Sequence, residues 1–409
     1  MPTKSSQKKG ALSRPEPRAR YPPKPSVEDV LATAGMALGL LPFETIKLST
    51  PESHRVYELN DLPAGPAADE SALSGIMPWE QGEVAVKEIR DAMNATGAAN
   101  DEEALATALK AFSSEDVTDG GGGGGGGSSS SSSSGSKALE QRGPGWYKLR
   151  RYKLSASQVA SVVRKSPFTS RRKMLYAKVY PKSHAYTGNT YTAWGTLHEP
   201  HAEEAFRESF LTPSTGMHTI SHCGFVCGRS QMWFGGFSPD GILERRNADQ
   251  RTLDAIAKET EPETEEGLED QEQRRQACYT TVHELVEYKC SAHHRDSDRH
   301  PYCKYWKNLP EHYLIQLQYS MHLARQRPEY RNMERAWFVC WQPRAIHVTH
   351  VPYMPAYATC LAEQAERFYH KKFVPACLRA MGKPGQQADL GDLVEEETAG
   401  GKRPRESND

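Results

Sequence analysis

The sequence lacks a long apolar run and a secretory leader. No apolar stretch approaches the roughly 18 residues that a membrane-spanning helix needs, and the longest candidate, from Leu31 to Phe43, contains glycine. The first ten residues, MPTKSSQKKG, have no apolar core of the kind that a signal peptide carries. We therefore expect a soluble intracellular protein with no membrane partner, while the choice between cytoplasm and nucleus stays open.

Paired cysteines are also lacking. The eight cysteines form no Cys-x-x-Cys pair, and in an intracellular chain of this size such cysteines are typical of reduced thiols. One alternative is a small zinc knuckle of Cys290, His293, His300 and Cys303, in which two residues separate the members of each pair. The loop between the two pairs is very short for a zinc module, so we favour a polar surface loop.

Apolar residues are scarce, at 37% of 409 residues. This content is too low for one compact globule, so part of the chain is predicted to be disordered. The run GGGGGGGGSSSSSSSGS within residues 120–142 indicates a flexible linker. Residues 1–119 are predicted to be mostly disordered, residues 143–381 to be folded and residues 382–409 to be a disordered polar tail. Short helices are expected before the linker at Val27–Leu41, Gly82–Met93 and Glu102–Phe112.

The formal net charge is only −1, but the charges are segregated along the chain. From Arg142 to Lys182 there are twelve Lys or Arg residues and no Asp or Glu. Such a block suits a phosphate backbone, whereas a solvated helix face is usually mixed in sign. Between Glu259 and Glu272 there are eight acidic residues and no basic one. We therefore expect residues 245–282 to be an inserted, solvated loop.

After the linker, helix and strand signals alternate. Apolar spacing, caps and prolines predict helices at Ser155–Lys165, Ser170–Tyr180, Tyr191–Phe210 (bent at Pro200), Pro310–Arg325 and Pro355–Met381. Strand-like runs are predicted at His218–Cys227, Gln231–Phe237, Ile242–Glu244, His283–Cys290, Ala336–Trp341 and Ile346–Tyr353. This order predicts an α/β or α+β core.

Two carboxylates and a lysine carry the strongest chemical signal. Asp240 lies on a Pro-Asp-Gly turn at a strand end, and Glu287 and Lys289 are two residues apart on a predicted strand. Alternate residues of a strand share a face, and hard oxygen ligands suit Mg²⁺ or Mn²⁺. Taken alone, an ExK on a strand usually marks an exposed edge, and Pro-Asp-Gly is usually an ordinary turn.

The surrounding segments narrow the choice. Trp194–Glu199 carries a carboxylate ahead of the strands, Tyr313–Met321 carries Gln316 after them, and Trp146–Arg150 leads into Ser155 and Ser157. With SPDG, ExKC and the WQPR of Trp341–Arg344, these segments resemble the lambda-type alkaline exonuclease and YqaJ viral recombinase family. That family belongs to the PD-(D/E)XK nuclease superfamily, and the resemblance covers Gly143 to Met381.

The resemblance implies a restriction-endonuclease-like α/β core, with a mixed central sheet flanked by helices. It implies Mg²⁺, with Mn²⁺ as the alternative ion, and a role for each site residue. The implied metal ligands are Asp240, Glu287, the backbone carbonyl of Tyr288, and Glu199, which completes the site. Lys289 matches the catalytic lysine. The positions that match holders of the DNA 5′-phosphate are Arg150, Ser157, Ser238 and Gln316.

The implied function is a hydrolase that degrades one strand of linear double-stranded DNA from its 5′ end and leaves 3′ overhangs. In this family the overhang feeds a single-strand annealing protein, and members of this kind can form ring-shaped homotrimers. Two alternatives stay open: an endonuclease or structure-specific nuclease on the same fold, and a non-catalytic DNA-binding module. An iron–sulfur nuclease is disfavoured, because its C-terminal cysteine cluster is absent.

Overall fold

A computed structural model describes ten stretches of the chain. They are residues 43–47, 76–112, 143–183, 190–211, 217–248, 250–258, 264–277, 279–290, 309–343 and 345–393. The chain divides into two units, residues 1–40 and 41–409, and every described residue lies in the second. The expected helix Val27–Leu41 and the Gly/Ser run lie outside the described residues. No described helix is both long and apolar enough to cross a membrane.

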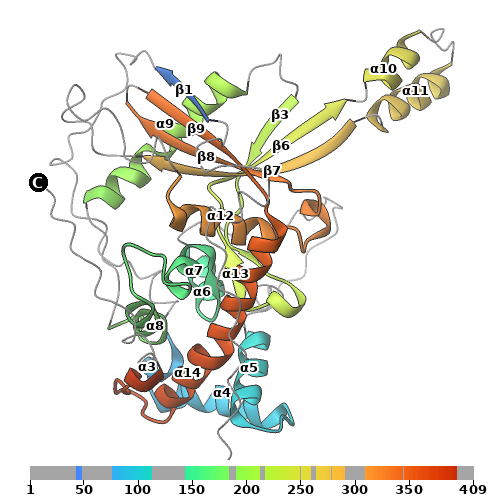
Figure 1. The fold of residues 1–409 in the computed structure, drawn as a ribbon. Helices are drawn as coiled ribbons and strands as arrows, with labels where there is room; N and C mark the ends of the chain where they lie inside the picture. Colours follow the sequence, from blue (N-terminus) through green and yellow to red (C-terminus); the bar gives the residue numbers. More distant parts are fainter. Residues whose placement is uncertain are drawn as a thin grey trace, which may run out of the picture. The chain divides into compact units, whose positions relative to one another are not determined.

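A six-stranded sheet forms the centre of this unit, with the order β1-β9-β8-β7-β6-β3 (Figure 1). Its strands are β1 (Phe43–Lys47), β3 (Met217–Ser221), β6 (Gly241–Ala248), β7 (Tyr279–Cys290), β8 (Arg335–Gln342) and β9 (Ala345–Pro352). Only the β7–β8 pair is parallel, and the other four pairs are antiparallel. The mixed sheet with helices on its faces confirms the expected mixed α/β class.

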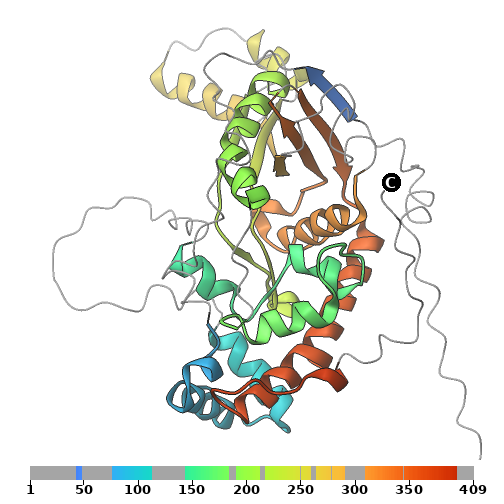
Figure 2. The ribbon, with the colours of Figure 1, turned by 90° about the vertical axis from the view of Figure 1, so that its left-hand side faces the viewer.

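Helices lie on both faces of this sheet (Figure 2). Helix α9 (Thr190–Phe210) contributes Ala202 and Phe206 to a buried cluster with Val286 and Tyr288 of β7. Helix α12 (Glu311–Ala324) lies on the other face, where the Tyr313 ring is 5.1 Å from that of Phe338 on β8. Because side chains alternate along a strand, β7 sends Val286 and Tyr288 toward α9, whereas Glu287 and Lys289 face α12.

A second, three-stranded sheet precedes the turn that contains Asp240. Its order is β2-β5-β4, with β2 (Leu154–Ser155), β4 (Val226–Cys227) and β5 (Gly235–Phe237). Strand β2 pairs with β5, which runs into the Asp240 turn, and Ser155 lies opposite Gly236 in this parallel pair. A Cβ atom at Gly236 would lie 2.2 Å from the Phe225 ring, so only glycine permits this approach.

The basic block folds into three short helices, α6 (Pro144–Arg150), α7 (Ala156–Val162) and α8 (Arg171–Val179). The backbone N–H of Ser155 donates to Gln158 Oε1 at 3.0 Å, which supports the start of α7 where the sequence predicts it. The expected helices from Ser155, Ser170, Tyr191 and Pro310 are confirmed within a few residues. Pro200 lies inside α9, which continues through it.

The predicted closing helix is three consecutive helical segments. They are α13 (Pro355–Phe368), a π turn (Tyr369–Phe373) and α14 (Val374–Met381). Pro375 has no N–H to donate to the preceding turn, and the π turn ends just before it.

Two strand predictions need correction. Ser230–Met232 is a 3₁₀ turn ahead of the short β5, and His218–Cys227 divides into β3 and β4.

Part of the region before the linker belongs to the folded unit. Helices α4 (Glu83–Ala95) and α5 (Asp101–Phe112) match two of the predicted short helices, and α3 (Pro78–Gln81) precedes them. The Trp79 indole is buried and donates to the Val179 carbonyl of α8 at 2.7 Å. Arg90 donates to the Met381 carbonyl at 2.9 Å. These long-range contacts lie in a region whose composition predicts that it is mostly disordered.

The acidic insertion at 245–282 is not a loop where the structure describes it. Strands β6 and β7 extend into it as a ladder that ends with Ala248 opposite Tyr279. Helices α10 (Gln250–Ala257) and α11 (Glu265–Ala277) follow at the end of this two-stranded ribbon (Figure 1). Several of the acidic residues lie on α11. Glu is a good helix former even where little apolar surface is available, so this segment can be helical despite its charge.

The tail also needs correction between residues 382 and 393. Ala388 and Leu390 are buried, and the hydroxyls of Tyr180 and Tyr176 accept their backbone N–H groups at 2.8 and 2.9 Å. Two apolar residues in a polar segment are enough to dock it, because these hydroxyls supply partners for its backbone.

Candidate active site

Three oxygen-bearing groups converge on the ammonium group of Lys289. This group donates to the carboxylate of Glu287 and to the Tyr288 carbonyl, the latter at 3.0 Å. Asp240 Oδ2 lies 3.9 Å from the same Nζ atom and also accepts the Tyr288 N–H at 2.7 Å. The turn after β5 and the C-terminal end of β7 therefore bring Asp240, Glu287 and Lys289 together.

The two carboxylates lie in a poorly solvated place. Burial, and then the charge of Glu287, raises the pKa of Asp240 well above its usual range. Burial alone would lower the pKa of Lys289, but Glu287 and Asp240 together raise it above its ordinary value. The lysine is therefore charged at neutral pH, and its positive charge offsets part of the repulsion between the two acids.

Helix α12 supplies two further groups to this cluster. Gln316 Nε2 donates to Glu287 Oε1 at 2.7 Å, and the Lys289 Nζ lies 5.5 Å from the centre of the Tyr313 ring. Tyr313 and Gln316 are three residues apart on a helix and so share a face. This spacing is a sequence signal that could have added Tyr313. Gln316 contacts the carboxylate cluster here, whereas its predicted role is to hold a phosphate.

Glu199 acts on the cluster through its charge. It lies on α9 and is among the groups that raise the pKa values of Asp240 and Cys290. Within the described ranges, no three His, Cys, Asp or Glu side chains are arranged to hold a metal ion. Two carboxylates and one carbonyl oxygen already converge on one positive charge, however. This donor set fits Mg²⁺, which usually takes one or two carboxylates and keeps several waters.

A second cluster surrounds Arg150, at the end of α6. Its guanidinium lies 3.9 Å from the centre of the Trp146 ring and 5.4 Å from that of Phe225. The Trp146 indole donates to Ser238 Oγ at 3.2 Å, and Ser238 is two residues before Asp240. Burial lowers the pKa of Arg150 to about 10, which leaves it charged at neutral pH. The structure thus brings Arg150 and Ser238 together through Trp146.

Ser157 begins α7 beside this cluster. Its hydroxyl lies 3.1 Å from that of Ser155, whose backbone pairs with β5 just ahead of Ser238. The predicted residues therefore fall into two groups. Asp240, Glu287, Tyr288, Lys289 and Gln316 form one, with Glu199 coupled to it by charge. Arg150, Ser157 and Ser238 lie in the segments that form the other.

One contact at the site was missed by sequence reasoning. His222 Nδ1 lies 3.0 Å from the backbone carbonyl of Asp240, and its Nε2 lies 3.1 Å from Glu203 Oε2 on α9. It thus links the Asp240 turn to α9. No sequence motif marks this histidine, because the link depends on β3 leaving the sheet beside the turn.

His198 packs inside the fold beside the site. The ring of His198 is buried and stacks on that of Trp194, with 3.9 Å between the ring centres. Three of the four residues of the zinc-knuckle alternative, His293, His300 and Cys303, lie outside the described part of the chain.

Comparison with known proteins identifies the domain that carries these residues. Residues 145–327, a little under half of the chain, match the YqaJ-like viral recombinase domain. No curated protein matches the sequence significantly. Among solved structures, an alkaline exonuclease from Laribacter hongkongensis is 16% identical, with a TM-score of 0.37 over 58% of this chain and 98% of that one. The same values hold for its complex with dAMP. Residues 145–327 are therefore similar to the YqaJ-like viral recombinase domain.

Proposed function

We propose that this protein is a Mg²⁺-dependent exodeoxyribonuclease with a PD-(D/E)XK site on a restriction-endonuclease-like core. It would degrade one strand of linear double-stranded DNA from the 5′ end and leave a 3′ overhang for strand-annealing recombination or DNA processing. The observation that carries this proposal is the convergence of Asp240, Glu287 and the Tyr288 carbonyl on the Lys289 ammonium group.

The residues of the carboxylate cluster have separate tasks in this proposal. Asp240, Glu287 and the Tyr288 carbonyl would hold the ion, with Glu199 adding negative charge. A bound Mg²⁺ would stabilise charge on the phosphate and lower the pKa of a water. Lys289 keeps a positive charge next to the scissile phosphate and orients the attacking water. Gln316 orients Glu287 through its 2.7 Å hydrogen bond.

The Arg150 cluster supports recognition of a strand end. A guanidinium binds a terminal phosphate with a fork of donors, and the hydroxyls of Ser157 and Ser238 fill remaining acceptor positions. Trp146 fixes the guanidinium from one side, at 3.9 Å. Ser238 lies two residues before Asp240. A phosphate held by Ser238 would therefore lie near the carboxylate cluster.

The test is a nuclease assay with the full-length protein. Linear duplex DNA is labelled at each end in turn, with and without a 5′-phosphate, and incubated with Mg²⁺ or EDTA. We expect Mg²⁺-dependent loss of the 5′-phosphorylated strand, with mononucleotides as products. Closed circular DNA should stay intact.

The variants separate catalysis from folding. Asp240→Asn should abolish turnover, whereas Asp91→Asn, which changes an exposed carboxylate on α4, should leave it unchanged. Cleavage of closed circular DNA would be consistent with the same carboxylate cluster but would show that the protein is an endonuclease. DNA binding without turnover in Mg²⁺ or Mn²⁺ would contradict the proposal and leave a binding module.

A further inference from the structure

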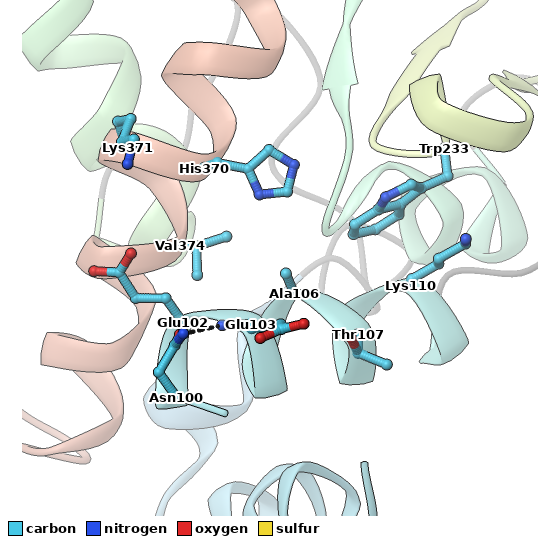
Figure 3. Close-up of a pocket in the computed structure, with 10 residues that line it drawn as sticks. All are labelled: Asn100, Glu102, Glu103, Ala106, Thr107, Lys110, Trp233, His370, Lys371 and Val374. Atoms are coloured by element: carbon cyan, nitrogen blue, oxygen red, sulfur yellow. Dashed lines mark hydrogen bonds between the residues drawn. The ribbon is translucent and has the colours of Figure 1, made fainter. Parts of the chain in front are cut away.

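A pocket of about 390 Å³ lies outside the candidate active site (Figure 3). Its volume falls in the range of about 300–1,000 Å³ that is usual for small-molecule sites. Its floor and one side come from α5, and its other sides come from the β4–β5 connection and the π turn. The residues that line it are Asn100, Glu102, Glu103, Ala106, Thr107, Lys110, Trp233, His370, Lys371 and Val374. Helix α5 and the π turn lie outside the matched family domain, residues 145–327.

Two aromatic rings point into this pocket. Figure 3 shows the Trp233 indole and the His370 imidazole reaching toward the space above Ala106. Both contact the buried Tyr369 ring edge-on, with 5.4 Å between the ring centres for Trp233 and 5.5 Å for His370. Lys153 Nζ also donates to the Trp233 carbonyl at 2.6 Å. The half-exposed indole is therefore held in place before any ligand arrives.

The geometry of the π turn contributes to the site. It lies between two α-helical segments and carries both His370 and Lys371. Single π turns inside α-helices occur frequently at functional sites. Burial lowers the pKa of His370, against the raising effect of Glu366, so the imidazole is neutral at pH 7 and can stack or share a hydrogen bond.

The charged groups of the pocket balance each other. Lys110 and Lys371 supply two positive charges, and Glu102 and Glu103 supply two negative ones. A polyphosphate would gain no net attraction here, whereas a single phosphate can contact a lysine while the carboxylates accept hydrogen bonds from amino or hydroxyl groups. Flat rings on the walls favour a flat ring as the ligand, since bases of every type stack on aromatic side chains.

We propose that this pocket binds a nucleotide with one phosphate, its base stacked on Trp233 and its phosphate near Lys110. The nucleotide can be a free mononucleotide or a residue of a DNA strand, because both present the same base and phosphate. The proposal goes beyond the proposed nuclease activity and does not depend on it, since no lining residue belongs to the carboxylate or Arg150 clusters.

The test is calorimetric titration of the full-length protein in EDTA, which prevents turnover. The probes are dAMP, deoxyadenosine and the single-stranded pentamer dA₅. We expect Trp233→Leu to weaken dAMP binding by about tenfold and Trp233→Phe by less than about threefold, because phenylalanine retains a stacking face. Trp337→Phe is the matched control. Trp337 lies on β8, where its indole donates to Glu284, and this variant should not change dAMP binding.

Lys110→Gln tests the phosphate and is safe for folding because this lysine is exposed. We expect it to weaken dAMP binding by about fivefold, through loss of a charge-assisted contact, without affecting deoxyadenosine. Binding of dA₅ more than tenfold tighter than that of dAMP, and lost in Trp233→Leu, assigns the pocket to a DNA strand; similar binding of both assigns it to a free nucleotide.

Two results would overturn the proposal. One is the absence of dAMP or dA₅ binding that depends on Trp233. The other is tighter binding of N-acetylarginine amide than of either nucleotide, which would make the pocket a site for a partner's arginine. An inactive protein that still shows Trp233-dependent binding would contradict the nuclease proposal alone.

Discussion

At the scale of single residues, the buried Lys178 contacts the backbone of the Arg150 cluster. This side chain is buried on α8 and donates to the carbonyl of Arg150 at 2.5 Å. It thereby caps the C-terminal end of α6 by donating to one of its last carbonyls. Burial, and then the charge of Arg150, lowers the pKa of Lys178 to about 7. We infer that the lysine holds the backbone from which the Arg150 side chain extends.

The first prediction concerns this lysine and pH. Between pH 7 and its ordinary pKa, Lys178 is neutral in the folded chain and charged in the unfolded one, so unfolding takes up a proton. Stability should therefore rise with pH across this window, by at most about 3–5 kcal/mol. Lys178→Met should remove that rise. The free energy of unfolding, measured by urea titration from pH 6 to 10, gives the comparison.

Lys173→Met is the matched control, since Lys173 is exposed on the same helix. It should keep the pH dependence of the wild-type protein. The same dependence in Lys178→Met would show that Lys178 does not titrate in this window.

At the scale of elements, the helices before the linker dock through one tryptophan. Trp79 is 1% exposed, its indole donates to the Val179 carbonyl at 2.7 Å, and its own carbonyl accepts the Gly385 N–H at 2.9 Å. These contacts join α3 to α8 and to the segment after α14. A region of low apolar content is thus held by a few large buried side chains.

The second prediction is that Trp79→Ala destabilises the whole folded unit. Loss of a buried tryptophan costs on the order of 3–5 kcal/mol, and the unpaired Val179 carbonyl adds to it. Thermal unfolding measures the effect. Val84→Ala, which truncates a side chain that is 82% exposed in the same region, should leave the Tm unchanged. Equal Tm values for the two variants would mean that these helices fold independently of the core.

The third prediction concerns the α10–α11 arm. Ala248 and Tyr279 are cross-strand partners at the end of the β6–β7 ribbon. Residues 249–278 can therefore be replaced by Asn-Gly, which favours the tight turn of a two-residue hairpin. We expect the shortened protein to keep its Tm within about 3 °C, because surface loops can be shortened at little thermodynamic cost.

The nuclease rate of the shortened protein should stay within about threefold of the full-length rate, since the site lies at the other end of β7. A loss of DNA binding with an unchanged Tm would instead show that the arm contacts the substrate.

At the scale of the whole molecule, charge is unevenly distributed although the sum is −1. The basic block forms α6, α7 and α8, and exposed cations such as Lys165 and Arg172 lie on these helices or the connection between them. A local surface of this kind attracts a phosphate backbone whatever the total charge.

The fourth prediction follows from that surface. The logarithm of the DNA-binding constant should fall with the logarithm of salt concentration, by about 0.9 for each phosphate contact. Lys165→Gln with Arg172→Gln should reduce this slope by about 1–2. Lys87→Gln, on α4, is the control and should leave the slope unchanged. Fluorescence anisotropy at several salt concentrations would measure it, and an unaltered slope in the double variant would place the DNA elsewhere.

The sequence alone determined the features that are local in the chain. Helix starts at Ser155, Ser170 and Pro310 follow from caps and prolines, which act over three or four residues. The pairing of Glu287 with Lys289 follows from strand periodicity. The order of the motifs around Asp240 is also local to the chain, and these motifs lie within the residues that match the YqaJ-like viral recombinase domain.

Tertiary structure decided what depends on contacts between distant segments. Trp79 finds Val179, Lys178 finds the Arg150 carbonyl, and Tyr313 reaches Lys289 only because sheet order and helix packing bring these segments together. The acidic insertion reads as a loop because its charges show no apolar periodicity, yet local helix propensity and the β6–β7 ladder organise it. The Trp233–His370 pocket could not be anticipated, since three segments that are distant in the sequence form its walls.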